Sequence, residues 1–183
     1  MKIFFDTEFT GLRKDTTLIS IGMVAENGET FYAELNDFDK SQCDDWLIEN
    51  VVSELLHDNH TEEWYSGVAD NQVYGNKKEV AYSLSDWLQQ FDEVQFVSDV
   101  CHYDMVLLID LFGSAFDLPK NVSAVCYDIK QDIAKHYGIS DREAFDKSRE
   151  EIVSELCKSE IDGVKHNALY DAMVIKAIYE ELN

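Results

Sequence analysis

The sequence predicts an α/β fold in which a mixed β-sheet, led by antiparallel strands, is flanked by helices. Three observations support this class: β-branched apolar segments come first, strand and helix patterns then alternate, and helical patterns fill the last third. With 183 residues, 45% of them hydrophobic, the chain has enough material for one core. We therefore expect residues 1–183 to form a single domain.

Strand patterns are concentrated near the N-terminus. The apolar, β-branched segments at 18–25 and 30–35 are separated by Glu26-Asn27-Gly28, and an Asn-Gly pair between such segments is typical of a hairpin. The full set of expected strands is 2–6, 18–25, 30–35, 94–97 and 122–127.

Helix patterns occupy most of the remaining chain. Apolar residues recur at spacings of three and four in 46–56 and 79–91, which indicates helices that bury one face. Gly113 follows 103–112 and predicts the end of that helix. The full set of expected helices is 46–56, 79–91, 103–112, 129–137, 142–157 and 168–182.

The charge of the chain bears on its partners. With 37 acidic and 15 basic side chains, the formal net charge is -22, which should repel a nucleic acid. Bound divalent cations can dominate the local field of a site, and an enzyme that acts on a strand end needs few phosphate contacts. Composition alone therefore argues against a nucleic-acid partner without excluding one.

Other composition features place the protein in a compartment. The four cysteines are widely spaced and form no Cys-x-x-Cys pair, which argues against a thiolate zinc site. The sequence contains no apolar run long enough to cross a bilayer and no secretory signal at its start. We expect a soluble, cytoplasmic protein.

The first candidate site is the pair Asp6 and Glu8 at the end of the opening strand. Residues two apart in a strand point to the same face, so both carboxylates can bind one hard cation such as Mg²⁺ or Mn²⁺. The same spacing occurs at Asp141 and Glu143, but there the acids lie at a polar helix start. Asp6 instead follows the apolar run 3–5, where an unpaired acid is costly.

Two further segments supply candidates. Asp104 begins an otherwise apolar helix, where its charge calls for a partner or a metal, although an acid in a first helical turn also favours the helix dipole. Asp99 and His102 are nearby polar candidates of lower rank. In the last segment, Asn167 is a candidate cap for the final helix, which would place His166 just before it and Asp171 in its first turns. His136 and Asp141 repeat this spacing, but across Gly138, a predicted helix end.

Taken together, these segments resemble the DEDD exonuclease superfamily, in the branch that has histidine as the general base. More narrowly, the chain is similar to small bacterial and phage exoribonucleases related to ribonuclease AS. The resemblance rests on Phe5-Asp6-Thr7-Glu8-Phe9-Thr10-Gly11, on His166 with Asp171, on the run 18–25, and on Tyr103-Asp104 followed by Leu111-Phe112-Gly113. One departure is Val100, where many members have asparagine.

The resemblance implies a ribonuclease H-like fold and hydrolysis of RNA from the 3′ end with two Mg²⁺ or Mn²⁺ ions. Asp6, Glu8 and Asp171 would hold the ion that binds the attacking water, and Asp6 with Asp104 the ion beside the leaving oxygen. His166 would be the base. Thr7 and Phe9 are candidate substrate-binding residues, with Phe9 able to stack on the terminal base. A homodimer is also implied.

Two alternatives remain open at this point. Within the same class, the substrate is DNA in place of RNA. In another class, the chain is a non-enzymatic acidic protein, either a DNA mimic or an inactive protein with the exonuclease fold. A mimic explains the charge directly, but not the acids that interrupt three apolar segments, because a mimic needs its charge outside.

Overall fold

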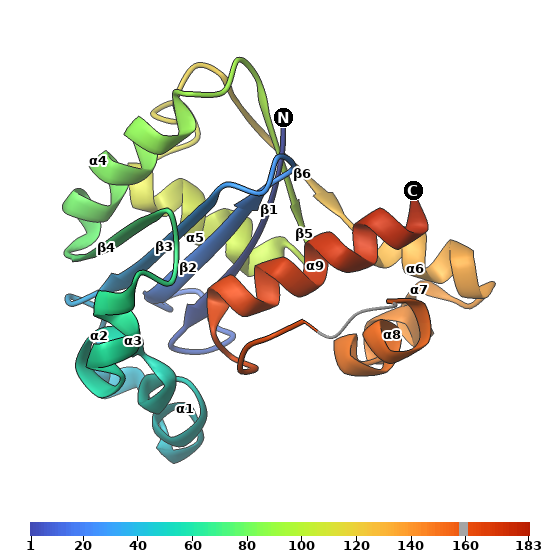
Figure 1. Ribbon diagram of the computed structural model, residues 1–183, viewed down its shortest axis with the longest axis horizontal. Helices are drawn as coiled ribbons and strands as arrows, with labels where there is room; N and C mark the ends of the chain where they lie inside the picture. The colour runs from blue at the N-terminus through green and yellow to red at the C-terminus, as the bar shows by residue number, and fades with distance from the viewer. Residues whose placement is uncertain (158–160) are drawn as a thin grey trace.

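The computed structural model describes residues 1–157 and 161–183 (Figure 1). Within these residues, six strands form one mixed sheet in the order β4-β3-β2-β1-β5-β6. The pairs β1–β2 and β2–β3 are antiparallel, whereas β4, β5 and β6 each run parallel to a neighbour. The predicted α/β fold with leading antiparallel strands is confirmed. The strands are β1 (Lys2–Phe9), β2 (Leu18–Ala25), β3 (Thr30–Leu35), β4 (Asn71–Gly75), β5 (Val94–Ser98) and β6 (Val122–Asp128).

Helices cover both faces of this sheet. The helices of the described residues are α1 (Asp45–Asn50), α2 (Leu56–Asn59), α3 (Thr61–Ser66), α4 (Lys77–Leu88), α5 (His102–Phe112), α6 (Lys130–Tyr137), α7 (Asp141–Asp146), α8 (Arg149–Leu156) and α9 (Ala168–Leu182), with 3-10 turns at Lys40–Gln42 and Val52–Glu54. In the part of the chain that the structure describes, no helix combines the length and the apolar character needed to cross a membrane.

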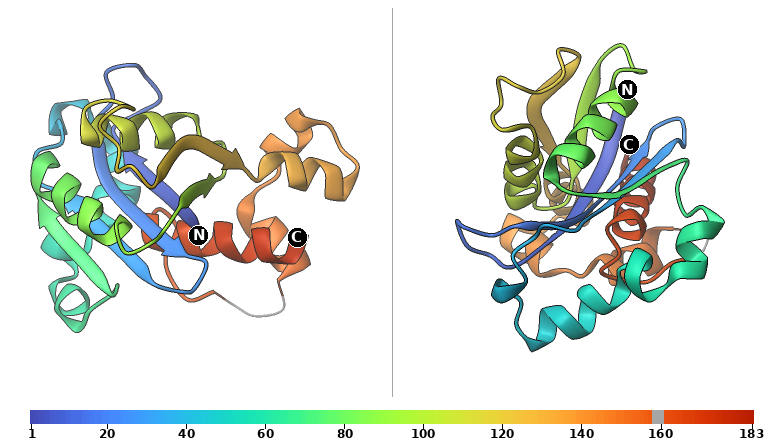
Figure 2. Two further views of the ribbon diagram at one scale, coloured as in Figure 1. Left: turned by 90° about the horizontal axis from the view of Figure 1, so that it is seen from above. Right: turned by 90° about the vertical axis from the view of Figure 1, so that its left-hand side faces the viewer.

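The alternation of β1 separates two layers of core. Phe5 packs with α4 and α5 on one face of the sheet, in a cluster that includes Leu84 and Leu108. Phe4 points to the opposite face, where it packs with Ile175 of α9. Figures 1 and 2 show α9 lying along one face of the sheet, with α4 and α5 on the other. Successive β1 side chains therefore face α9 and α5 in turn.

Gly22 determines how closely α9 approaches the sheet. It lies opposite Asp6 in the β1–β2 ladder. A Cβ atom at Gly22 would lie 2.2 Å from the backbone nitrogen of Leu169, so β2 and the start of α9 are in direct backbone contact. This contact brings the first turns of α9 beside β1.

Two expected helices are wrong as single elements. The segment 46–56 breaks into α1, a 3-10 turn and the start of α2, because the chain turns to bury Val51 and Leu55 against Ile19 and Phe38. The segment 142–157 breaks between α7 and α8. Lys147 is extended there, and the Ser148 side chain caps α8 by accepting a hydrogen bond from the Glu151 amide.

Several elements had no prediction. Strand β4 is an edge strand with the sequence Asn-Gln-Val-Tyr-Gly, whose polar residues give little apolar alternation. Helices α2 and α3 span four and six residues, which is too short for a clear helical period. The other predicted strands and helices are present, with bounds shifted by three residues or fewer at each end.

Candidate active site

Strand β1 and helix α9 bring three of the candidate acids together. Asp6 and Glu8 lie on the face of β1 that looks toward α9, and Asp171 lies in the first turn of that helix. Asp6 and Asp171 are 6% and 5% exposed. Glu8, His166 and Asp171 each offer one ligand atom within 4.8 Å of the others, and His166 Nδ1 is 4.0 Å from Glu8 Oε1. As strand alternation predicts, the side chains of Asp6 and Glu8 point to the same face of β1.

Asp104 joins this group from the opposite layer. It lies in the first turn of α5, and its Oδ1 accepts hydrogen bonds from the Thr7 amide at 3.1 Å and from the Thr7 hydroxyl at 2.6 Å. Because Thr7 points to the α5 face, β1 contacts both helices through neighbouring residues. All five predicted residues, Asp6, Glu8, Asp104, His166 and Asp171, line one cavity of about 400 Å³.

The backbone around His166 orients both the histidine and Asp171. His166 has a φ of 68°, in the left-handed region, and its amide donates a hydrogen bond to Asp171 Oδ2 at 3.0 Å. The Asn167 side chain caps α9, as predicted, by accepting from the Leu169 and Tyr170 amides. Trp46 of α1 packs edge-on against the imidazole, with ring centroids 5.2 Å apart.

Burial and mutual repulsion disfavour ionisation of the four acids. Burial, with repulsion from Asp6 and Asp171, raises the pKa of Glu8 to about 10. Burial, with a further contribution from neighbouring carboxylates, raises the pKa of Asp6 and of Asp104 to about 7 each. The pKa of Asp171 is raised as well, chiefly by burial. Such a group of oxygen ligands fits hard divalent cations, because they neutralise the charge that the acids cannot carry alone.

Burial lowers the pKa of His166, whereas it raises the pKa of the four acids. Burial, helped by the positive charges of Lys165 and Arg149, lowers the pKa of its imidazole below the usual 6.5. The ring is therefore neutral at physiological pH and has a nitrogen free to accept a proton.

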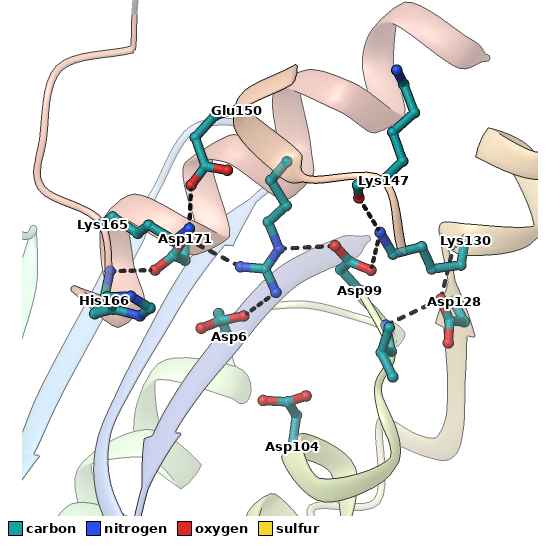
Figure 3. A network of polar contacts seen from close by, with 12 residues as sticks. Asp6, Asp99, Asp104, Asp128, Lys130, Lys147, Glu150, Lys165, His166 and Asp171 are labelled. Atoms are coloured by element: carbon teal, nitrogen blue, oxygen red, sulfur yellow. Dashed lines mark hydrogen bonds and ion pairs between the residues drawn. The ribbon is translucent and has the colours of Figure 1, made fainter. Parts of the chain in front are cut away.

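Arg149 is a member of the site that sequence reasoning missed. It is the first residue of α8, and its guanidinium makes ion pairs with Asp6 at 2.9 Å, Asp99 at 2.8 Å and Asp171 at 3.2 Å. Figure 3 shows Asp6, Asp99 and Asp171 pointing toward one another across the network. The spacing of Ser148 and Glu151 is that of a helix cap, and this signal could have indicated a separate helix that begins at Arg149.

Other basic and aromatic side chains surround the same cavity. Lys130, Lys147 and Lys165 line it together with Arg149, although the chain as a whole is strongly acidic. The rings of Phe9 and Tyr103 stack at 5.5 Å and also line it.

The lower-ranked candidates have structural roles or lie at the surface. Glu143 belongs to the capping box of α7, and Asp141 and His136 are exposed. Asp99 is buried and pairs with Arg149 and Lys130, whereas His102 is exposed.

The family follows from a comparison over nearly the whole chain. A family model described as the 3′-5′ exoribonuclease Rv2179c-like domain matches residues 1–182. The chain belongs to this family. It is 28% identical over 133 residues to the 3′-5′ exoribonuclease Rv2179c of Mycobacterium tuberculosis H37Rv. The matched region covers 72% of this chain and 73% of that protein. The 3′-5′ exoribonuclease MT2234.1 of strain CDC 1551 matches equally well.

Solved structures agree with the fold. The nuclease domain of 3′hExo, described as a DEDDh family member bound to rAMP, superposes with a TM-score of 0.68 at 15% identity, covering 97% of this chain and 88% of that domain. A 3′-exonuclease that recognises the 3′ end of a histone mRNA stem-loop gives a TM-score of 0.65 at 14% identity, covering 99% of this chain and 63% of that one. The predicted ribonuclease H-like fold is confirmed by these structures, and the predicted relation to small 3′-5′ exoribonucleases is confirmed by the family match.

Proposed function

We propose that the chain removes nucleotides from the 3′ end of RNA by metal-dependent hydrolysis and releases nucleoside 5′-monophosphates. One observation carries the proposal: three buried acids, the largely buried Glu8 and a neutral histidine just before α9 line one cavity, in a chain that belongs to a 3′-5′ exoribonuclease family. A protein that acts as an external charge mimic has no use for these buried positions.

The four acids would hold two divalent ions, Mg²⁺ or Mn²⁺. Asp6, Glu8 and Asp171 are assigned to one ion, and Asp6 with Asp104 to the other. Their burial and raised pKa values support this role, because a nearby dication favours their ionised forms. When bound, such ions supply a polarised water and neutralise charge on the phosphate.

His166 would act as the general base. Its side chain is partly exposed and lines the cavity, and its lowered pKa leaves the imidazole unprotonated at neutral pH. A neutral imidazole within reach of the attacking water takes the water's proton as the new P–O bond forms. The proton then resides on the imidazole, whose Nδ1 lies 4.0 Å from Glu8 Oε1. The bond from phosphorus to the 3′ oxygen of the preceding nucleotide breaks in the same step, and that oxygen takes a proton from solvent to leave the shortened RNA with a 3′-hydroxyl.

Tyr103 is a second aromatic candidate for the substrate-binding role that the sequence predicts for Phe9. The Phe9 and Tyr103 rings form an aromatic surface beside the acids, on which the terminal base can stack. The hydroxyl of Thr7 donates to Asp104, so Thr7 would act on the substrate through that carboxylate. RNA is preferred over DNA on the family membership.

A degradation assay with a matched variant tests the proposal. Labelled RNA and DNA with 3′ overhangs are incubated with the protein and Mn²⁺ or with a chelator. We expect RNA cleavage that needs metal, is lost by at least about 10³-fold in Asp6→Asn, and is unchanged in Asp141→Asn, whose carboxyl group lies exposed on α7. Intact RNA with the unaltered protein contradicts the proposal, and faster cleavage of DNA reassigns the substrate.

The assembly and the location of the protein stay predictions. The resemblance to small exoribonucleases implies a homodimer, which light scattering after size-exclusion chromatography tests. A cytoplasmic location is expected and is tested by fractionation of cells that express the protein.

A further inference from the structure

The guanidinium of Arg149 has a separate carboxylate for each of its three nitrogens. Nε pairs with Asp99, Nη2 with Asp6 and Nη1 with Asp171, at 2.8, 2.9 and 3.2 Å. The Arg149 side chain is 25% exposed, and its partners are almost fully buried. Two of the three partners are acids to which the proposed function assigns a metal ion, and Asp99 is not.

The same oxygen atoms cannot serve Arg149 and a metal ion in this arrangement. Asp6 Oδ1 and Asp171 Oδ1 both face the guanidinium. Mg²⁺ requires carboxylate oxygens at about 2.0–2.1 Å. A dication at that distance from both oxygens would lie a few ångströms from the arginine charge, where repulsion is strong. A dication that binds these two Oδ1 atoms therefore requires the guanidinium to move.

We propose that Arg149 is a tethered cation that competes with divalent metal for Asp6 and Asp171 and then binds the RNA phosphate once metal has displaced it. The inference rests on the proposed function and adds a positioning residue to it. The Nε–Asp99 pair is the tether, since it involves no metal-binding acid. Asp99 is itself held in place, 3.5 Å from the ammonium of Lys130.

The phosphate contact follows from the fate of the two Nη groups. When Asp6 and Asp171 bind metal, Nη1 and Nη2 lose their acceptors, and a partly buried N–H group without an acceptor is unfavourable. Arg149 lines the cavity that the RNA end would enter. A phosphate offers two oxygens in the geometry that a guanidinium binds best.

Calorimetric titration with MnCl₂ tests the competition directly. Arg149→Gln should bind Mn²⁺ about tenfold more tightly than the unaltered protein, because no cation has to be displaced. In chelator the same variant should melt at a lower temperature, since its acids have lost their counter-charge. Arg142→Gln, an exposed arginine on α7 with a partner at 4.0 Å, is the matched control and should change neither quantity.

A second variant, Arg149→Lys, controls for a folding defect in Arg149→Gln. One ammonium cannot bond three carboxylates at once, so its Mn²⁺ affinity should fall between those of the other two proteins. In steady-state cleavage of RNA at saturating Mn²⁺, Arg149→Gln should raise KM about tenfold and change kcat by less than about threefold.

The outcomes separate this inference from the proposed function. If the unaltered protein cleaves RNA and binds Mn²⁺ but Arg149→Gln and Arg149→Lys bind Mn²⁺ no more tightly, the competition is overturned and the function stands. An unchanged KM overturns the phosphate contact. If the unaltered protein neither binds Mn²⁺ nor cleaves RNA, the proposed function itself fails.

Discussion

The proton chemistry of the proposed reaction depends on His166, whose backbone is left-handed and whose amide fixes Asp171. A substitution there has to keep this backbone. Asparagine tolerates positive φ better than most residues and keeps the amide donor, but it cannot accept a proton at neutral pH. His166→Asn therefore tests the imidazole alone.

We expect His166→Asn to lower kcat for RNA cleavage by about 10² to 10⁴-fold, the usual contribution of a general base. Because burial lowers the pKa of His166, the acid limb that this residue adds to the pH–rate profile should lie below pH 6.5. Rates measured from pH 5 to 8 should show that limb in the unaltered protein and lack it in the variant. A variant with unchanged kcat would mean that another group takes the proton.

Val100 has the most strained backbone of the residues around the cavity. Its φ is 58°, a region that β-branched side chains rarely adopt. This is the position at which many DEDD exonucleases have asparagine, a residue that fits left-handed backbone. The departure noted in the sequence therefore has an energetic cost in the fold, on the order of 1 to 3 kcal/mol.

Val100→Asn should consequently raise the melting temperature by about 2 to 4 °C, as measured by differential scanning calorimetry. Val125→Asn makes the same chemical change at an exposed position of strand β6. It should give no increase, because asparagine is disfavoured in strands. A lower melting temperature for Val100→Asn would show that packing by valine outweighs the backbone strain.

At the scale of elements, the site depends on the backbone contact between β2 and α9. Gly22 permits this contact, since a Cβ there would lie 2.2 Å from the Leu169 nitrogen and 2.3 Å from the Ala168 carbonyl carbon. A side chain at position 22 would push the start of α9 away from β2. The same segment holds His166 and Asp171 beside β1.

Gly22→Ala should destabilise the protein by about 1 to 3 kcal/mol and lower RNA cleavage by at least about tenfold in the fraction that remains folded. Urea unfolding and kcat measured on the same sample check both effects. Gly28→Ala is the comparison: it strains a turn at φ 95° with nothing within 4 Å, so it should cost stability and leave kcat unchanged. If both variants have the same kcat, the β2–α9 contact does not determine the geometry of the site.

The elements also show what local sequence can and cannot predict. Strands β2 and β3 and helix α9 have the predicted bounds, because each carries an uninterrupted period of apolar residues. The expected helices 46–56 and 142–157 failed because their breaks depend on tertiary burial of Val51 and Leu55 and on a single cap at Ser148. A period of apolar residues does not reveal such interruptions.

At the scale of the whole molecule, the acids of the site arrive from distant parts of the chain. The Asp-x-Glu spacing of Asp6 and Glu8 can be recognised in the sequence, but Asp141 and Glu143 have the same spacing. The apolar context of Asp6 and the family resemblance, rather than spacing alone, distinguished the two pairs. The cap at Ser148 could have indicated a helix that begins at Arg149, but nothing in the sequence indicates that Arg149 belongs to the site. It pairs with Asp6 across 143 positions of sequence, and that contact exists only in the folded chain.

This crowding of acids predicts how stability depends on pH. Because the pKa of Glu8 is raised in the folded protein, ionisation of Glu8 favours the unfolded chain. The loss of stability grows as the pH rises from 4.5 toward about 10. In chelator, Glu8→Gln should melt above the unaltered protein, and the gap should widen by at least about 5 °C between pH 5 and pH 8. Adding Mn²⁺ at pH 8 should close it.

Glu143→Gln provides the control for this measurement. Hydrogen bonds from Ser140 lower the pKa of Glu143, the opposite direction to that of Glu8. Its removal should shift the melting temperature equally at pH 5 and pH 8. A gap for Glu8→Gln that stays constant with pH would show that Glu8 is ionised without penalty in the metal-free protein.

The placement of the basic residues has a kinetic consequence. Lys130, Lys147, Arg149 and Lys165 line the cavity of a molecule whose net charge is -22. With divalent ions bound to the acids of the site, an RNA end would meet repulsion from the whole surface at long range and attraction to the ions and these basic side chains within the last few ångströms. Salt screens the long-range repulsion more than the short-range attraction, because the Debye length is about 8 Å at 0.15 M. Stopped-flow capture of labelled RNA should accelerate as salt rises from about 10 to 100 mM, the reverse of the usual trend for nucleic-acid-binding proteins.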